Sequence, residues 1–226
     1  MGSLSKEQKR FLESTAAQYA EHLDDAAEWL EGRGIDLDHA RYEGLGVVRN
    51  PPALHEYHEG RLAIPYITEY GVVNMSFRCL KDHKCKETLD YVKADGTKVN
   101  CAKYKKLKGA ESDLYGVRAF DEARDWIGVC EGELDSLILR QIGIPAVSNP
   151  GAKNWKEWWP NVFEDFSRIY IFADGDTAGE GMFEKFQDGL SKTSAAVIKV
   201  RLPAGEDVNS TYQKYGAEAI LKRIKK

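Results

Sequence analysis

The sequence has no long hydrophobic run. No stretch of its 226 residues approaches the roughly 18 apolar residues that a membrane-spanning helix needs. Residues 1–13 also lack the apolar core of a secretory signal peptide. These absences argue against a membrane or exported protein, and they predict a cytoplasmic protein with no membrane partner.

Cysteine is scarce as well, with four residues in the chain. Four cysteines at this length do not make the dense disulfide framework of small secreted proteins, so reduced thiols are expected. The sequence shows no internal repeat and no low-complexity linker. A net charge of −4 and 42% hydrophobic residues are ordinary for a globular protein of one or two domains.

The first half of the chain predicts a mixture of helices and hairpins. Apolar residues recur every three or four positions from about residue 4 to 31 and predict a helix, and a short helix is expected at 38–42. Strands are expected at 62–68 and 72–80, and a second hairpin turns at Asp95-Gly96. This region is therefore expected to be α+β.

From about residue 119 strands alternate with helices. Short apolar runs predict strands at 126–130, 144–148, 168–174 and 195–202, with helical segments between them and a last helix at about 216–224. Continuous apolar strands that alternate with helices indicate a mainly parallel sheet covered on both faces. The predicted fold class is α/β, with a smaller α+β subdomain in front.

Acidic residues follow three of these predicted strands. Glu131 and Asp135 come after the first strand, Asp174 and Asp176 after the third, and Asp207 after the fourth. If the strands are parallel neighbours, these carboxylates meet at one edge of the sheet, where ligands gather in open α/β folds. Carboxylate oxygens suit Mg²⁺, and two such ions can serve phosphoryl transfer.

Each cluster also has a purely structural interpretation. Thr177-x-x-Glu180 fits a helix capping box, Asp207 fits a turn, and Glu131 with Asp135 fits an exposed helix face. Taken singly these interpretations are as good as the metal hypothesis. They do not explain why every cluster lies at the same end of its strand.

The stretches "GVCEGELDSL", "IYIFADGDTAGEGM" and "VRLPAGEDVNS" together resemble the Toprim domain. That domain carries a glutamate motif and a downstream Asp-x-Asp motif. It is shared by DnaG-type primases, topoisomerases, OLD-type nucleases and recombination mediators. The Toprim resemblance alone therefore leaves the function open.

The upstream half resembles the RNA polymerase core of DnaG-type primases. The stretch "EWLEGRGIDLDHARYEGLGVV" is similar to its opening segment, and "GRLAIPYITEYGVVNMSFRCL" to a hairpin that carries two arginines. "KYKKLKG" followed by "DLYGV" resembles the primase Lys-Tyr motif. The ordered resemblance implies a primase-like subdomain at 1–118 and a Toprim domain at 119–226.

This resemblance implies a DNA primase, a nucleotidyltransferase that makes short RNA primers from NTPs on single-stranded DNA during replication. Glu131, Asp174 and Asp176 would be catalytic and would bind Mg²⁺ or Mn²⁺, two ions being expected, with Asp135 and Asp207 as further ligands. The residues that would contact template or NTP are Arg61, Arg78, Lys103, Lys105, Lys106 and Lys108. A replicative helicase is a further candidate partner, and the setting would be a bacterial or phage-infected cytoplasm.

The sequence departs from the cellular family in two ways. No zinc-ribbon module and no helicase-binding region is evident, as expected of compact phage forms or of a catalytic-core fragment. The stretch between Arg78 and Lys103 is long and holds four candidate zinc ligands, Cys79, His83, Cys85 and Cys101. Their spacing lacks the usual Cys-x-x-Cys knuckle, so zinc is judged unlikely and free cysteines around a hairpin are preferred.

Some aromatic and histidine residues are interpreted as structural rather than functional. Trp155, Trp158 and Trp159 could stack on bases, but their spacing favours the core. His22, His39, His55 and His58 fit no catalytic pattern and are expected at the surface. Two other functions remain open: a Toprim nuclease that needs metal but no NTPs, and a non-catalytic nucleic-acid-binding accessory protein of replication or recombination.

Overall fold

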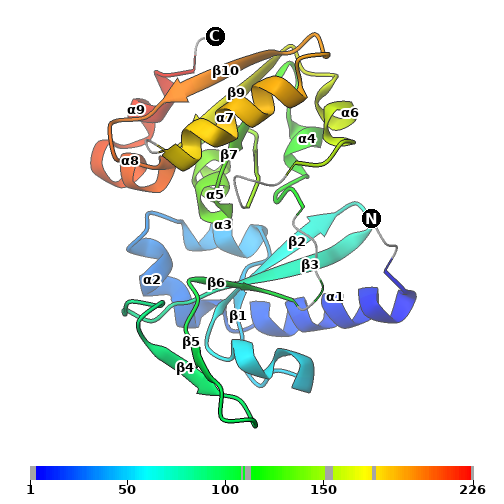
Figure 1. Ribbon diagram of the computed structural model, residues 1–226, viewed down its shortest axis with the longest axis vertical. Coiled ribbons are helices and arrows are strands. Elements are labelled where there is room, and N and C mark those ends of the chain that lie inside the picture. The colour runs from blue at the N-terminus through cyan, green and yellow to red at the C-terminus, as the bar shows by residue number, and fades with distance from the viewer. Residues whose placement is uncertain (1–3, 108, 110–112, 151–154, 175–176, 225–226) are drawn as a thin grey trace. The chain divides into compact units, whose positions relative to one another are not determined.

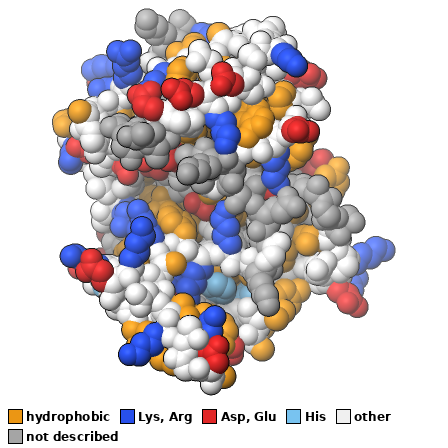
Figure 2. All heavy atoms as spheres, viewed as in Figure 1, with side chains coloured by type: hydrophobic (Ala, Val, Ile, Leu, Met, Phe, Trp, Pro, Cys, Tyr) orange, Lys and Arg blue, Asp and Glu red, His pale blue; other side chains and the backbone are white. Residues whose placement is uncertain are grey.

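The computed structural model describes residues 4–107, 109, 113–150, 155–174 and 177–224. It divides into two compact units, one made of Met1–Glu31 and Leu37–Ala110, the other of Gly32–Asp36 and Glu111–Lys226 (Figure 1). Among the described residues, no helix is both long and apolar enough to cross a membrane. On the face shown in Figure 2, Lys and Arg side chains lie among Asp and Glu side chains.

The helices of the first unit are α1 (Lys6–Ala20), η1 (Leu23–Ala26), α2 (Ala27–Glu31), α3 (Leu37–Tyr42) and η2 (Ala53–His58). Ser5 begins α1 with a capping box, in which its hydroxyl and the side chain of Gln8 bond each other's backbone N–H groups. The single helix predicted for 4–31 is wrong, because the chain breaks at Glu21 and His22. The apolar spacing continues through the break and conceals it.

An antiparallel sheet forms the centre of this unit, in the order β1 (Gly46–Val47), β2 (Leu62–Thr68), β3 (Gly71–Arg78) and β6 (Tyr104–Lys106). A separate ladder pairs β4 (Leu89–Val92) with β5 (Lys98–Asn100). Helix α1 packs its apolar face onto the sheet, where Leu12 and Tyr19 join Met75 and Phe77 in one buried cluster. The prediction of an α+β region is confirmed.

Two histidines of this unit lie in its core, so their predicted surface position is wrong. His55 Nδ1 lies 3.0 Å from the hydroxyl of Tyr19, and the ring of His58 stacks on Phe77 with centroids 3.8 Å apart. Burial lowers the pKa of both imidazoles. For His58 the pKa falls to about 4, with further lowering by His55, Lys105 and Arg61.

We expect this unit to lose stability as the pH falls from about 6.5 to about 4. In that range the unfolded chain protonates His58 while the folded chain keeps it neutral, which disfavours folding by up to about 3 kcal/mol. Urea unfolding at several pH values measures the slope. In His58→Phe, which keeps the stacked ring, the slope should become shallower by the contribution of His58, while the contribution of His55 remains. An unchanged slope would assign it to other groups.

The second unit contains a wholly parallel sheet in the order β10-β9-β7-β8 (Figure 1). Its strands are β7 (Trp126–Cys130), β8 (Ala146–Ser148), β9 (Arg168–Ala173) and β10 (Ala196–Arg201). Its helices are α4 (Ala119–Glu122), α5 (Glu133–Gln141), α6 (Trp159–Phe163), α7 (Thr177–Gly189), α8 (Val208–Tyr215) and α9 (Ala217–Leu221). The prediction of a parallel α/β sheet is confirmed, but α8 was not predicted.

Helices cover both faces of this parallel sheet. Helices α6 and α7 bury one face with Trp159, Phe163, Met182 and Phe186. Helix α5 lies on the other face, against β7 and β8, and packs on α8 (Figure 1). Trp159 is fully buried, which confirms its core position, whereas Trp158 is 39% exposed. The packing fixes the ends of β7 and β9, from which the acidic residues project.

The short segment Gly32–Asp36 belongs to the second unit although it lies between α2 and α3 in sequence. Its backbone is bound by side chains of α5 and α8. Gln141 Nε2 donates to Gly34 O at 2.9 Å, and Asn209 Nδ2 donates to Arg33 O at 2.7 Å. Gln213 Nε2 donates to Gly32 O at 2.9 Å. Side-chain amides of α5 and α8 thus bind the backbone carbonyls of this segment to the second unit.

Candidate functional site

The acidic residues lie at the point where the strand order of the parallel sheet reverses. From β7 the chain crosses to β8 on one side, whereas β9 pairs on the other side of β7 and is followed outward by β10. Such a switch point leaves a crevice outside the carboxyl ends of the two central strands. Cys130 pairs with Phe172 in register, so Glu131 and Asp174 leave adjacent strands just beyond the paired residues. The topology brings these two residues to the same edge of the sheet.

The buried thiol of Cys130 reports on the charges around this edge. Burial raises its pKa well above the ordinary value, and the negative charge of Asp135 raises it further. Arg140 opposes these effects, while Asp174 and Glu131 add to them. Three carboxylates from α5 and from the ends of β7 and β9 therefore act on one sulfur atom. Carboxylates are the ligand type that Mg²⁺ or Mn²⁺ prefers. Among the described residues, however, the ligand atoms of these three carboxylates do not converge as a group, whereas those of Cys79, His83, Cys85 and Cys101 do.

The first turn of α7 lies directly against the backbone of Asp174. A Cβ atom on Gly179 would come within 2.7 Å of Asp174 N and would also overlap its carbonyl oxygen. Glycine is therefore required at this position, a signal that sequence reasoning missed. Glu180, next along α7, forms an ion pair with Lys199 of β10. The predicted site residue Asp176 lies outside the described residues.

Asp135 and Asp207 are both engaged with the chain that follows β10. Asp135 Oδ1 accepts a hydrogen bond from Asn209 N at 3.1 Å, a contact that sequence reasoning missed. Asp207 begins α8 as its N-cap, and its Oδ1 accepts from Ser210 N at 2.7 Å. The Asp135 contact links the acidic cluster after β7 to the segment after β10. The local role of Asp207 is to cap a helix.

The predicted phosphate contacts Arg61 and Lys105 are held by internal partners. Arg61 is 4% exposed, and its guanidinium donates to Ala102 O at 2.9 Å, to Asp90 at 3.2 Å and to Cys101 Sγ at 3.1 Å. Lys105 Nζ lies 2.5 Å from the same carboxylate oxygen of Asp90. These two cations hold the pKa of Asp90 below its usual range, in spite of its burial. In this structure they stabilise one half-buried carboxylate.

The other predicted basic contacts differ in exposure. Arg78 is buried, with its guanidinium 5.0 Å from the ring centroid of Tyr104 and 5.6 Å from that of Trp29. Lys103 is exposed and Lys106 is half-buried, while Lys108 lies outside the described residues. Among the members of this set that the structure describes, Lys103 offers the most accessible ammonium group to a polyanion.

The four candidate zinc ligands converge. The sulfur atoms of Cys79, Cys85 and Cys101 and a ring nitrogen of His83 all lie within 4.8 Å of one another. This arrangement weakens the prediction that zinc is unlikely. It stands apart from the carboxylate cluster in sequence and in ligand chemistry.

Known proteins resemble this chain in both of its halves. Residues 126–218 match the Toprim domain family. The gene 57 protein of Mycobacterium phage D29 is 31% identical over 172 residues, which cover 74% of this chain and 99% of the phage protein. A DNA primase of Clostridium acetobutylicum is 26% identical over 182 residues, which cover 79% of this chain. The chain spans only 28% of that primase's length.

The fold is also that of a solved primase core. The structure of the DnaG primase catalytic domain bound to ssDNA superimposes with a TM-score of 0.74, over 95% of this chain and 77% of that one. The two are 19% identical, so this likeness bears on the fold alone. The Toprim match and the sequence similarity to the phage protein and to the DNA primase place the chain: this protein belongs to the DnaG-type primase family, with the fold of that family's catalytic domain and a Toprim domain.

Proposed function

We propose that this protein is a metal-dependent DNA primase, which makes short RNA primers from NTPs on a single-stranded DNA template. The observation that carries the proposal is the register of β7 and β9, because it delivers Glu131 and Asp174 to the switch point of the sheet. The similarity of 182 residues to a DNA primase supports it. So does the DnaG catalytic domain of the same fold, which is described as bound to ssDNA.

The reaction joins the 3′ hydroxyl of a growing primer to the α-phosphorus of an NTP and releases pyrophosphate. Glu131 and Asp174 would hold divalent cations, with Asp176 as their neighbour in sequence and Asp135 and Asp207 as further carboxylates. When bound, Mg²⁺ or Mn²⁺ would neutralise the triphosphate and activate the attacking hydroxyl. The buried strands β7 and β9 fix the carboxylates, so that little reorganisation is needed when substrate arrives.

The basic residues of the first unit would bind the phosphate groups of the template and of the NTP. Lys103 is exposed and suits a backbone phosphate of the template, a contact that carries no sequence information. Arg61, Arg78, Lys105, Lys106 and Lys108 belong to the same proposal. Those of the five that are bound by internal partners would orient the exposed Lys103 and add positive electrostatic potential around it. We assign this work to residues 1–118 and the metal chemistry to 119–226.

Primer synthesis with labelled NTPs on mixed-sequence single-stranded DNA, with Mg²⁺ or Mn²⁺, tests the proposal. We expect short RNA products that require both template and metal. Cleavage of the template without NTPs would instead identify a Toprim nuclease. Equal DNA binding with and without EDTA, together with no product on any template, would identify a non-catalytic accessory protein.

Two glycines of α7 provide a test of how Asp174 is positioned. Gly179→Ala should lower primer synthesis by about tenfold or more, since the new methyl group must displace the backbone of Asp174. Gly181→Ala should leave synthesis intact and raise helix stability by up to about 1 kcal/mol, since nothing lies within 4 Å of its Cβ position. Initial rates and melting temperatures are measured for both variants. Equal activity of the two would remove the positioning role of Gly179.

A further inference from the structure

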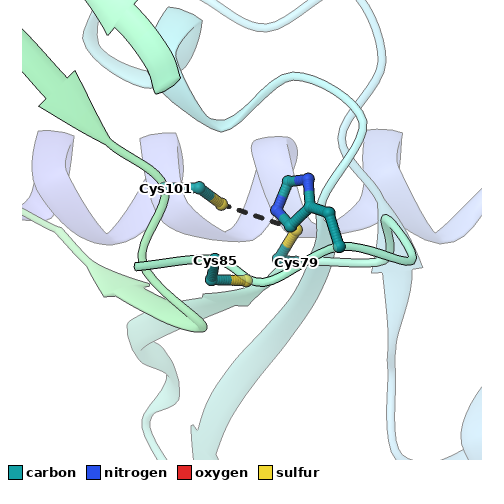
Figure 3. A group of neighbouring side chains, drawn as sticks. Cys79, Cys85 and Cys101 are labelled. Atoms are coloured by element: carbon teal, nitrogen blue, oxygen red, sulfur yellow. Dashed lines mark hydrogen bonds between the residues drawn. The ribbon is translucent and has the colours of Figure 1, made fainter. Parts of the chain in front are cut away.

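Three cysteines and one histidine of the first unit surround a common point. Cys79 directly follows β3, His83 and Cys85 lie in the loop after it, and Cys101 follows β5. Figure 3 shows the three cysteine side chains beside one another, drawn from two segments of the chain. All four ligand atoms lie within 4.8 Å of each other. Two segments, residues 79–85 and Cys101, thus present soft ligands to the same place.

Two distances between these atoms match the edges of a zinc tetrahedron. Zinc binds sulfur at about 2.3 Å and imidazole nitrogen at about 2.0–2.1 Å, so tetrahedral geometry gives S–S edges of about 3.8 Å and S–N edges of about 3.6 Å. Cys79 Sγ lies 3.7 Å from Cys101 Sγ and 3.6 Å from His83 Nε2. A disulfide needs about 2.05 Å between its sulfurs, so the pair at 3.7 Å is not bonded.

The surroundings suit a thiolate centre. Cys79 and Cys101 are buried, and Arg61 Nη2 donates to Cys101 Sγ at 3.1 Å. Three thiolates around one Zn²⁺ carry a net charge of −1, which the Arg61 guanidinium would balance. Zinc that binds the folded chain would stabilise the fold.

We propose that Cys79, His83, Cys85 and Cys101 bind one Zn²⁺ in a closed, structural, tetrahedral site. Four protein ligands leave no open position, so the ion has no place for a substrate. Thiolate and imidazole ligands at tetrahedral spacing select zinc over the Mg²⁺ or Mn²⁺ of the carboxylate site. The four ligands belong to the first unit, in the stretch of sequence between β3 and β6.

The ion would hold the segment between β3 and β6, residues 79–103, against the four-stranded sheet of the first unit. The β4–β5 ladder has no fully buried residue along its strands, and an isolated two-stranded hairpin is marginal in water. Cys79 N donates to Lys103 O at 3.0 Å, and Arg61 Nη1 donates to Ala102 O at 2.9 Å. The zinc ligands therefore flank the backbone that leads into β6 and that carries the exposed Lys103.

Metal analysis of the full chain, purified from zinc-supplemented cells and dialysed, tests the proposal. We expect one zinc per chain, and we expect Co²⁺ in its place to show the d–d bands of a tetrahedral site and a thiolate-to-cobalt charge-transfer band. The charge-transfer band separates this site from ions held by carboxylates. A chain that contains no zinc and gives no such band with Co²⁺ would overturn the proposal, whether or not the protein makes primers.

Matched variants locate the ion. Cys101→Ser and His83→Ala should lower zinc affinity by on the order of 10²-fold or more. Cys130→Ala and His22→Ala, which change the same residue types outside the cluster, should retain the full zinc content. Stoichiometric zinc of unchanged affinity in both Cys101→Ser and His83→Ala would disprove the assignment. If a ligand variant does not fold, the cobalt spectrum of the unaltered chain still decides.

Discussion

Asp174→Asn is expected to lower primer synthesis by on the order of 10²–10³-fold while leaving the fold intact. The substitution keeps the shape of the side chain but removes one negative charge from the switch point beside Glu131 and Asp135. A metal ligand at a phosphoryl-transfer site contributes several kcal/mol of transition-state stabilisation, and each 1.4 kcal/mol is about tenfold in rate. Initial rates at saturating NTP and metal measure the loss.

The control for this variant is the same change at the opposite end of the same strand. Asp165 is exposed and precedes β9, whereas Asp174 follows it. Asp165→Asn should retain the full rate. Raising the Mn²⁺ concentration should recover part of the activity of Asp174→Asn, because the lost charge weakens metal binding. Wild-type rates in Asp174→Asn would disprove the assignment of this carboxylate to the reaction.

Trp159→Ala should destabilise the second unit by about 3–5 kcal/mol, the usual cost of removing a buried tryptophan. Its ring is fully buried and packs edge-on against Trp155 and nearly parallel to Phe186. Such a loss takes a large part of the stability of an ordinary domain, so partial unfolding at 37 °C is expected. Urea unfolding followed by circular dichroism measures the change.

Trp158→Ala is the matched control, because Trp158 is 39% exposed and adjacent in sequence. Its stability should change by less than about 1 kcal/mol. If the tryptophans instead served as a stacking platform for bases, the two variants would differ little in stability, and Trp158→Ala would weaken binding of single-stranded DNA. That pattern would contradict the core role of Trp159.

The sequence predicted the parallel sheet well because its strands are continuous apolar runs. Strands β7, β9 and β10 lie within one or two residues of their predicted bounds. Strands β1 and β6 are only two and three residues long, and they exist because longer neighbours pair with them. Helix α8 was missed because "VNSTYQKY" is short, with 8 residues, and its only aliphatic residue is Val208. The signal Asp207-x-x-Ser210, which caps it, was present.

The site was predictable where it depends on strand ends, and unpredictable where it depends on distant partners. Adjacent parallel strands sufficed to bring Glu131 and Asp174 to one edge. The contact of Asn209 N with Asp135 spans 74 residues and involves a backbone group that has no sequence signature. Likewise, no local pattern shows that Asp90 engages Arg61 and Lys105. The spacing of the cysteines argued against zinc because Cys101 is distant in sequence from the other three ligands. The β4–β5 hairpin brings it back beside them.

The segment Gly32–Asp36 bears on how such a protein can be divided or recombined. A gene fragment that begins after residue 110 would encode a Toprim sheet without the backbone that Gln141, Asn209 and Gln213 bind. Those three amides would then face solvent or a foreign segment. Exchange of residues 111–226 between lineages would therefore have to carry residues 32–36 as well, or replace these three contacts.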